Sequence, residues 1–209
     1  MIPKVIHYCW FGHGEKPELA KKCIESWKKF CPDFEIREWN EETYDVKCHP
    51  YAKFCADNKK WAFLSDYVRL DVVARFGGIY LDTDVEVVRS LEPLLKYPAF
   101  YGFENAQYVA TGLGFGAEAG HPTVVAMRGA YDHLQNRDGT ICVTGCPSGC
   151  YLCRRYHRKG RSAGWQGSRP CLHRSGQRRP EDRRQRLHRQ RSGAECCRLC
   201  PVQGRDRRF

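Results

Sequence analysis

Residues 61–86 read WAFLSDYVRLDVVARFGGIYLDTDVE, and their pattern is more informative about the fold than any other part of the chain. Its first part carries apolar side chains three and four positions apart, which predicts an amphipathic helix over residues 61–76. Gly77 stands where the C-cap of that helix falls, and Gly78 lets the chain turn sharply. A short apolar strand, Ile79-Tyr80-Leu81, comes next. The stretch therefore predicts a helix, a glycine pair, a strand and an acidic turn, in that order.

Asp82 and Asp84 follow this strand directly. In extended backbone, residues two apart point to the same side, so both carboxylates can reach one cation. Mn²⁺ and Mg²⁺ prefer oxygen ligands and are commonly held by one or two carboxylates, with water and substrate phosphates completing the shell. We expect the pair to hold such a cation on a diphosphate. The alternative is an acidic surface turn, which is common for two isolated acids.

Asp66 and Arg69 stand three residues apart in the predicted helix and are therefore neighbours on one face. A pair of this kind is usually a solvated ion pair that contributes little to stability. Here the helix leads into the acidic turn. The same two side chains can instead present a hydrogen-bond acceptor and a cation to a sugar and a phosphate.

These residues carry a resemblance to a known family. The block 62–84 resembles the sugar-binding region of the DXD-containing glycosyltransferases of family 32, which include capsular polysaccharide transferases and α-mannosyl or α-galactosyl transferases. Three further parts of the chain look like that family in the same order, and the likeness covers about residues 2–147. Within the block, the resemblance rests on Ala62, Ser65-Asp66, Arg69 and Gly77 to Asp84. The three further parts are Ile2 to Gly12, Glu38-Trp39-Asn40, and Gly112 to Gly116 with Gly120-His121-Pro122.

The resemblance implies a metal-dependent, retaining hexosyltransferase. It would move a sugar from a UDP- or GDP-linked donor to a hydroxyl of a polysaccharide or glycolipid, with Mn²⁺ or Mg²⁺ as cofactor. It also implies roles for single residues. Asp84 contacts the metal and Asp82 bridges metal, ribose and sugar. Asp66 and Arg69 orient the sugar, Tyr80 belongs with the donor-binding residues, and Trp10 stacks on the base.

The front of the chain predicts a β-α-β unit. Val5 to Trp10 and residues 34–39 read as strands, and between them Pro17 opens a helix with Leu19 on its buried stripe. Such units form parallel sheets that bind nucleotides at the carboxyl ends of their strands. We expect an α/β, GT-A-like domain with a mainly parallel sheet over residues 1–147. Trp10 can also be a core residue, which is common for tryptophan in a first strand.

Three shorter features complete this domain. His7 is expected to be a packed, hydrogen-bonded histidine rather than a metal ligand, because no second ligand stands at helix or strand spacing to it. Residues 98–103 and 109–116 read as later strands. Residues 121–134 read as a helix over the sheet.

Residues 148–209 differ sharply in composition from the rest. They contain seventeen Arg and one Lys against four acidic residues, a net charge of +14, whereas residues 1–147 carry −3. They have too little apolar material to offset the entropy of ordering. We expect an Arg- and Cys-rich tail with little stable structure. No closing element with His and Trp, as the family usually has, can be recognised in it.

Three interpretations of the tail stay open. Clusters such as Arg183-Arg184 favour a basic arm that neutralises nucleic-acid phosphates, which makes a nucleic-acid-binding protein the rival function. Cys146, Cys150 and Cys153 have the spacing of an iron–sulfur loop, although little chain is left to build the barrel that normally carries one. A shifted reading frame in a GC-rich gene explains the composition most simply, and it predicts impaired activity of this chain.

The remaining expectations concern location and partners. No apolar run approaches the roughly 18 residues of a spanning helix, so we expect a cytoplasmic enzyme portion, or peripheral attachment at the inner face of a membrane. The expected partners are a nucleotide sugar and a saccharide or glycolipid acceptor, without nucleic acid.

A phosphohydrolase built on the same acids has little support, because no His-Asp clusters accompany them.

Overall fold

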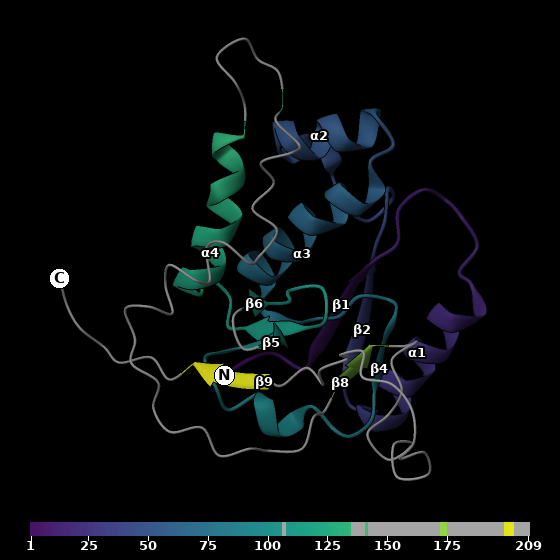
Figure 1. Cartoon of the computed structure of the whole chain (residues 1–209), viewed down its shortest axis with the longest axis vertical. Helices are drawn as coiled ribbons and strands as arrows, with labels where there is room; N and C mark the ends of the chain where they lie inside the picture. Colours follow the sequence, from purple (N-terminus) through teal and green to yellow (C-terminus); the bar gives the residue numbers. More distant parts are fainter. Residues whose placement is uncertain (106–107, 135–140, 142–171, 175–198, 203–209) are drawn as a thin grey trace, which may run out of the picture.

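The computed structural model describes residues 1–105, 108–134, 141, 172–174 and 199–202, and Figure 1 shows their helices and strands. Short 3₁₀ turns lie at Val46–Cys48, Glu92–Leu94 and Ala130–His133. In chain order the other elements are β1 (Val5–Cys9), α1 (Glu18–Phe30), β2 (Glu35–Trp39), α2 (Pro50–Asp57), α3 (Trp61–Phe76), β3 (Gly78–Tyr80), β4 (Val85–Val87), β5 (Ala99–Asn105), β6 (Tyr108–Val109), β7 (Phe115–Ala117), α4 (Pro122–Gly129), β8 (Leu172–Arg174) and β9 (Leu199–Val202).

Helix α3 begins and ends at the residues that the sequence predicted. The two positions that follow it require glycine for two reasons, one conformational and one steric. Gly77 has φ +67° and Gly78 has φ +103°, both in the region that favours glycine. There is also no room for a side chain. A Cβ at Gly77 would lie 2.7 Å from the backbone nitrogen of Ala119, and one at Gly78 would lie 2.8 Å from His7 Nε2. The glycines therefore let α3 pass directly into β3 in the centre of the sheet.

The main sheet has the order β2-β1-β3-β7-β5-β6, with β9 also paired to β5. Strand β1 is parallel to both β2 and β3, whereas β7 is antiparallel to both β3 and β5. Strands β2, β1, β3 and β5 therefore run in one direction, as the predicted α/β class requires. The helices in the crossovers from β1 to β2 and from β2 to β3 make these strands parallel.

The later strands depart from the prediction of one strand over residues 109–116. Strand β6 ends at Val109 and β7 begins at Phe115, and a tight turn lies between them. The Leu113 N–H donates to the Ala110 carbonyl at 3.1 Å within this turn. Because β5 and β7 are joined without a crossover helix, they pair antiparallel.

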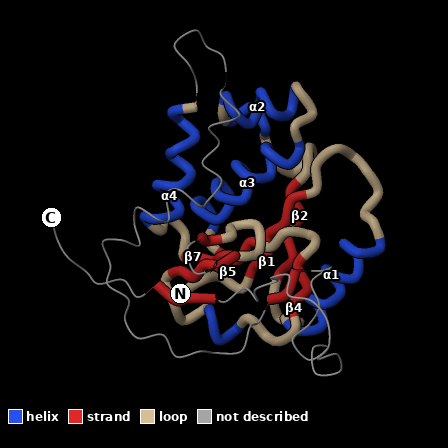
Figure 2. Tube along the Cα trace, viewed as in Figure 1, coloured by secondary structure: helices blue, strands red, loops and turns tan. Residues whose placement is uncertain are grey.

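The sheet separates two apolar cores. Alternate residues of a strand point to opposite faces, so Ile79 packs with Trp27 of α1 on one face, while Tyr80 packs beneath α3 on the other. Figure 2 shows α2, α3 and α4 gathered on one side and α1 apart from them. Tyr80 is thereby directed toward the helix that carries Asp66 and Arg69.

The expectation for Leu19 was wrong, since its side chain is 48% exposed. Trp27 sets the buried face of α1, and its Nε1–H donates to the Val85 carbonyl at 2.8 Å. Ala20 stands seven residues before Trp27, almost two full turns, and is buried on the same face. Leu19 stands one residue further away and is rotated off that face.

His7 is hydrogen-bonded and fully buried, as the sequence predicted. The Trp39 Nε1–H donates to His7 Nδ1 at 3.1 Å. His7 Nε2 therefore carries the proton and donates to the Gly77 carbonyl at 2.8 Å. Burial, the foremost cause, lowers the pKa of His7 from 6.5 to about 4. His7 is thus a neutral residue that joins the first strand to the glycine turn.

Most of residues 148–209 lie outside the described ranges, so the predicted tail stays a prediction. Two short strands within it are described: β8 pairs with β4, and β9 pairs with β5. Cys146, Cys150 and Cys153 lie outside the described residues. Across the described ranges, each helix is too short or too polar to span a membrane.

Candidate functional site

Four of the predicted site residues, Asp66, Arg69, Tyr80 and Asp82, come together near the carboxyl ends of β1 and β3, where the connections of the sheet change sides. From β1 the chain crosses through α1 to β2 on one side, and α3 then leads to β3 on the other side. The two helices cover opposite faces of the sheet. An open α/β sheet forms a ligand-binding crevice at such a switch point. The turn after β1 and the acidic turn after β3 both follow neighbouring parallel strands at this switch point.

Arg69 joins two of the predicted carboxylates. Its Nη2 atom lies 3.0 Å from Asp66 Oδ1 and 3.2 Å from Asp82 Oδ1. Only 9% of the Arg69 side chain is exposed, so the pair with Asp66 is not the solvated surface pair that was the alternative. Burial acts to lower the pKa of Arg69, but Tyr80, Asp82 and Asp66 outweigh it and raise the pKa. The guanidinium therefore stays charged and fixed.

Tyr80 also contacts the Asp82 carboxylate. Its hydroxyl donates to Asp82 Oδ1 at 2.9 Å, and its ring centroid lies 5.0 Å from Arg69 Cζ. Burial, followed by the Asp82 charge, raises the pKa of Tyr80 well above its ordinary value. The hydroxyl is thus a permanent donor that holds the orientation of Asp82. Cys9 lies close by, and burial raises the pKa of its thiol to about 12, so it stays protonated.

Asp66 experiences opposing influences. Burial raises its pKa, the Arg69 charge lowers it, and the Asp82 carboxylate raises it again, with a net increase. The two acids are thus held near each other by the guanidinium between them. Without that charge their repulsion would be uncompensated in a half-buried site.

The backbone of the acidic turn differs from the extended chain that the sequence predicted. The Val85 N–H donates to the Asp82 carbonyl at 3.0 Å, so residues 82–85 form a tight turn rather than extended chain. The prediction that Asp82 and Asp84 share a side because they are two apart in a strand therefore rested on the wrong backbone. Both side chains are half-buried. The turn arises because β3 ends at Tyr80 and β4 starts at Val85.

Trp10 follows β1 and is half-buried against the α1 core. Its Nε1–H donates to the Gly14 carbonyl at 2.6 Å, and Lys16 Nζ lies 5.7 Å from its ring centroid. Lys16 also pairs with Glu38 at 2.8 Å, a contact that sequence reasoning missed. The signal for Glu38 was its place directly before the end of the second strand, at the same edge of the sheet.

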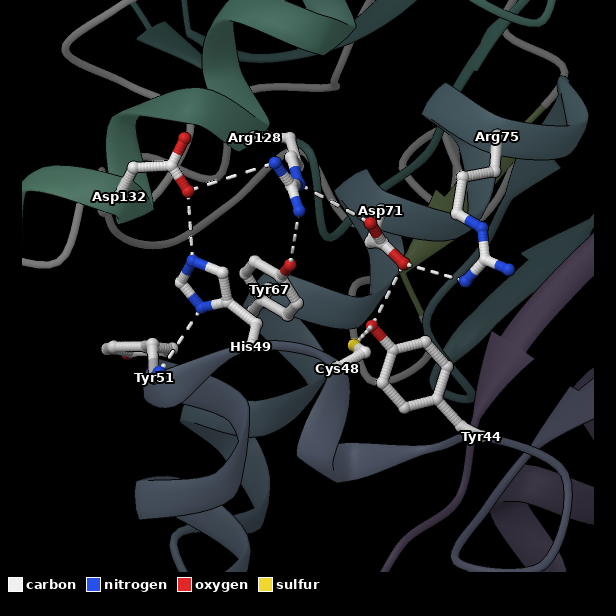
Figure 3. Close-up of polar contacts among 9 residues, drawn as sticks. All are labelled: Tyr44, Cys48, His49, Tyr51, Tyr67, Asp71, Arg75, Arg128 and Asp132. Carbon is white, nitrogen blue, oxygen red and sulfur yellow. Dashed lines mark hydrogen bonds and ion pairs between the residues drawn. The ribbon is translucent and has the colours of Figure 1, made fainter.

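A polar network ties α3 to the elements that pack around it (Figure 3). Its centre is Asp71, whose side chain is 6% exposed. The Tyr44 hydroxyl donates to Asp71 Oδ2 at 2.9 Å, Arg75 Nη1 lies 3.3 Å from the same oxygen, and Arg128 Nε lies 3.4 Å from Oδ1. Arg128 also donates to the Tyr67 hydroxyl at 3.1 Å. Helix α4 is thereby tied to α3.

His49 extends the network to α2 (Figure 3). It caps that helix, since its Nδ1 accepts from the Tyr51 N–H at 3.2 Å. Its Nε2–H therefore donates to Asp132 Oδ1 at 2.9 Å. The His49 ring stacks on Tyr67 with centroids 4.5 Å apart. Sequence reasoning did not find this network, because its partners come from distant parts of the chain.

Residues 17–101 match the family described as a glycosyltransferase sugar-binding region containing a DXD motif. The matched segment includes α3, the glycine pair and both aspartates. Nothing in these comparisons supports a nucleic-acid-binding protein. The predicted resemblance to DXD-containing glycosyltransferases is therefore confirmed.

Two relatives have names that state an activity. Inositol phosphoceramide mannosyltransferase 3 of Schizosaccharomyces pombe is 33% identical over 134 residues, which are 60% of this chain and 36% of that protein. Mannosyl phosphorylinositol ceramide synthase CSH1 of Saccharomyces cerevisiae is 31% identical over 107 residues, which are 48% of this chain and 27% of that protein. The chain thus spans only about a third of the length of these relatives.

A solved structure shows the same fold. PaToxG Glycosyltransferase superposes with a TM-score of 0.59 at 17% identity, covering 74% of this chain and 69% of that one. The predicted GT-A-like α/β class is therefore confirmed. Residues 17–101 are thus similar to glycosyltransferase sugar-binding regions that contain a DXD motif.

Proposed function

We propose that this chain is a metal-dependent, retaining glycosyltransferase that moves a hexosyl group from a UDP- or GDP-linked sugar to a hydroxyl of a glycolipid. Mannose is the favoured sugar and a phosphoinositol-bearing lipid the favoured acceptor, because the names of two relatives state these. A polysaccharide hydroxyl is the second acceptor class. An acceptor held in a membrane agrees with a protein that works in the cytoplasm or peripherally at the inner face.

The observation that carries this proposal is the bridge from Asp66 through Arg69 to Asp82, with contacts of 3.0 and 3.2 Å. It stands at the switch point of the sheet, the place where sheets of this type bind nucleotides. A charged guanidinium with two fixed carboxylates offers a cation to a diphosphate and acceptors to sugar hydroxyls. Arg69 and Asp66 would orient the sugar, and Trp10 would stack on the base from the turn after β1.

The two aspartates of the acidic turn fit a hard cation. They are half-buried carboxylates two residues apart, the ligand type that Mn²⁺ and Mg²⁺ prefer. No three His, Cys, Asp or Glu side chains gather as a metal cluster in the part of the chain that the structure describes. The donor set thus suits a cation shared with substrate phosphates. Held by Asp82 and Asp84, the ion would neutralise charge developing on the leaving diphosphate.

The chain's own residues would act by position and charge. Arg69 and the Tyr80 hydroxyl hold Asp82 in one orientation before substrate binds, so little reorganisation is needed during transfer. The Arg69 charge would lie close to the departing diphosphate. Asp66 would accept hydrogen bonds from sugar hydroxyls and keep the reacting carbon facing the acceptor.

The proposal is tested by incubating the purified chain with UDP- or GDP-linked hexoses and an inositol phosphoceramide acceptor, with Mn²⁺ or with EDTA. Formation of a glycosylated lipid with Mn²⁺, and its loss in EDTA, is the expected result. Hydrolysis of the donor without acceptor would still support the donor half of the proposal. No donor consumption in any metal would contradict it.

A further inference from the structure

The turn after β1 makes an unusually close contact with the first residue of α3. Gly12 has φ +100°, and a Cβ placed there would lie 2.8 Å from Trp61 Nε1 and 3.0 Å from Trp61 Cδ1. The half-buried Trp61 indole therefore occupies the space next to the Gly12 backbone. Only glycine combines this backbone conformation with this approach.

The same turn is held from two other directions. The Gly12 N–H donates to Glu41 Oε1 at 2.5 Å, which ties the turn to the chain after β2. The Trp10 Nε1–H donates to the Gly14 carbonyl at 2.6 Å, which closes the turn on its own tryptophan. Trp61 supplies the third contact, the one from α3. The position of Trp10 is therefore set jointly by β1, the chain after β2 and α3.

Helix α3 carries the residues of the sugar half of the site. The Ser65 hydroxyl donates to the Trp61 carbonyl at 3.0 Å, and Asp66 follows directly. Arg69 lies about one turn further along the same helix. A shift of the Trp61 contact would thus move the turn that carries Trp10 relative to Asp66 and Arg69.

We propose that Trp61 is a positioning residue that sets the spacing between the base-binding turn and the sugar-binding helix. This inference rests on the proposed function, since it takes the turn after β1 as the place of the nucleotide base. Trp61 lies outside the acidic motif, and it would affect binding of the base and not binding of the diphosphate. Trp61 also packs at the edge of the α3 core, so a purely structural role is the alternative.

The two roles differ in which ligand they affect. A structural role would weaken every ligand equally through loss of folded protein. A positioning role would weaken ligands that carry a base and leave a base-free diphosphate unaffected, because the acidic turn and Arg69 stay in place. UDP and GDP with Mn²⁺ serve as base-bearing probes, and inorganic pyrophosphate with Mn²⁺ serves as the base-free probe.

The experiment measures binding of these probes by calorimetry for the wild type, Trp61→Ala, Trp61→Phe and Gly12→Ala, with melting curves for each. Trp61→Ala should weaken the better nucleoside diphosphate about tenfold, the lower part of the range for base stacking, and change pyrophosphate less than about twofold. Trp61→Phe keeps a flat ring against Gly12 and should restore most of the affinity. Gly12→Ala should reproduce the selective loss.

Phe63→Ala is the matched control, since Phe63 is a 38% exposed aromatic residue two positions along the same helix and should leave both probes unchanged. Equal losses for nucleoside diphosphate and pyrophosphate in folded Trp61→Phe and Gly12→Ala would overturn the inference. Unchanged nucleotide affinity in Trp61→Ala would overturn it as well. Failure of the wild type to bind any nucleoside diphosphate would instead contradict the proposed function, and this inference with it.

Discussion

The guanidinium of Arg69 lies 3.2 Å from the Asp82 carboxylate, so one ion pair joins helix α3 to the acidic turn after β3. The same guanidinium contacts Asp66 at 3.0 Å. Two acids of different elements are therefore brought together around one buried cation. The orientation of Asp82, and with it the proposed donor site, depends on a side chain thirteen residues earlier in the sequence.

Arg69→Met should abolish this arrangement. Removing one partner of a buried pair leaves uncompensated charge and costs about 3–5 kcal/mol of stability. Transfer should fall at least about 100-fold, because a misplaced reacting group is costly even when the protein folds. Arg69→Lys should restore stability better than activity, since an ammonium cannot match the planar guanidinium. The control is Arg75→Met, whose 55% exposed side chain lies on the same helix. Equal activities for Arg69→Met and Arg75→Met would contradict this assignment.

Tyr80→Phe removes only the hydroxyl that donates to Asp82 at 2.9 Å and keeps the ring beneath Arg69. The loss of stability should be about 1 kcal/mol, the typical net value of one hydrogen bond. Donor turnover should fall about tenfold, because Asp82 loses a hydrogen bond that orients it. Steady-state kinetics beside denaturant unfolding separates these effects. A variant with full turnover would show that the hydroxyl has no role in positioning Asp82.

The pKa of His7 predicts a pH dependence of stability. Its folded pKa is about 4 and its ordinary value is 6.5, so between these values the unfolded state binds a proton that the folded state does not. The contribution of His7 to the free energy of unfolding is therefore complete above pH 6.5. It falls by about 3 kcal/mol in total as the pH is lowered toward 4. Urea unfolding from pH 7.5 to 4 measures this slope.

His7→Gln provides the comparison for that slope. It keeps a polar side chain but removes the titrating group, so its stability should be lower at pH 7 and should change less with pH. If wild type and variant show parallel curves between pH 6.5 and 4, His7 is not the titrating group responsible.

Gly78→Ala should destabilise the fold by about 2–4 kcal/mol, because φ is +103° and the new Cβ would lie 2.8 Å from His7 Nε2 and 2.9 Å from the Val5 carbonyl oxygen. Gly129→Ala is the control, since its Cβ would meet nothing closer than 3.7 Å, and it should change stability by less than about 1 kcal/mol. Thermal melting of both variants suffices. Similar melting temperatures for the two would refute the close-approach argument.

Much of this fold follows from local signals. The ends of α3 were predictable because its apolar period is clear and Gly77 marks its end, and both signals lie within the helix and its next residue. The proximity of Asp66, Arg69 and Asp82 was predictable, because the helix spacing and the acidic turn lie within one short stretch. Their contacts confirm that this stretch folds back on itself.

Other features depend on parts of the chain that local patterns do not connect. The backbone of Asp82 to Val85 forms a turn and not a strand, because β4 must leave the main sheet to pair elsewhere. The reversal of β7 between β3 and β5 depends on which strands meet, which no local pattern records. The ion pair between Asp71 and Arg128 likewise requires α3 and α4 to pack first.

If the acidic turn binds a nucleoside diphosphate through a divalent cation, calorimetry should show UDP or GDP binding that depends on Mn²⁺. The wild type should bind one of them only with the cation. Asp84→Asn should lose that binding while melting at the wild-type temperature, because the change removes a charge and keeps the shape. Asp57→Asn, a change at an exposed acid of α2, should bind normally. Unchanged, metal-dependent affinity in Asp84→Asn would show that the acidic turn does not hold the cation.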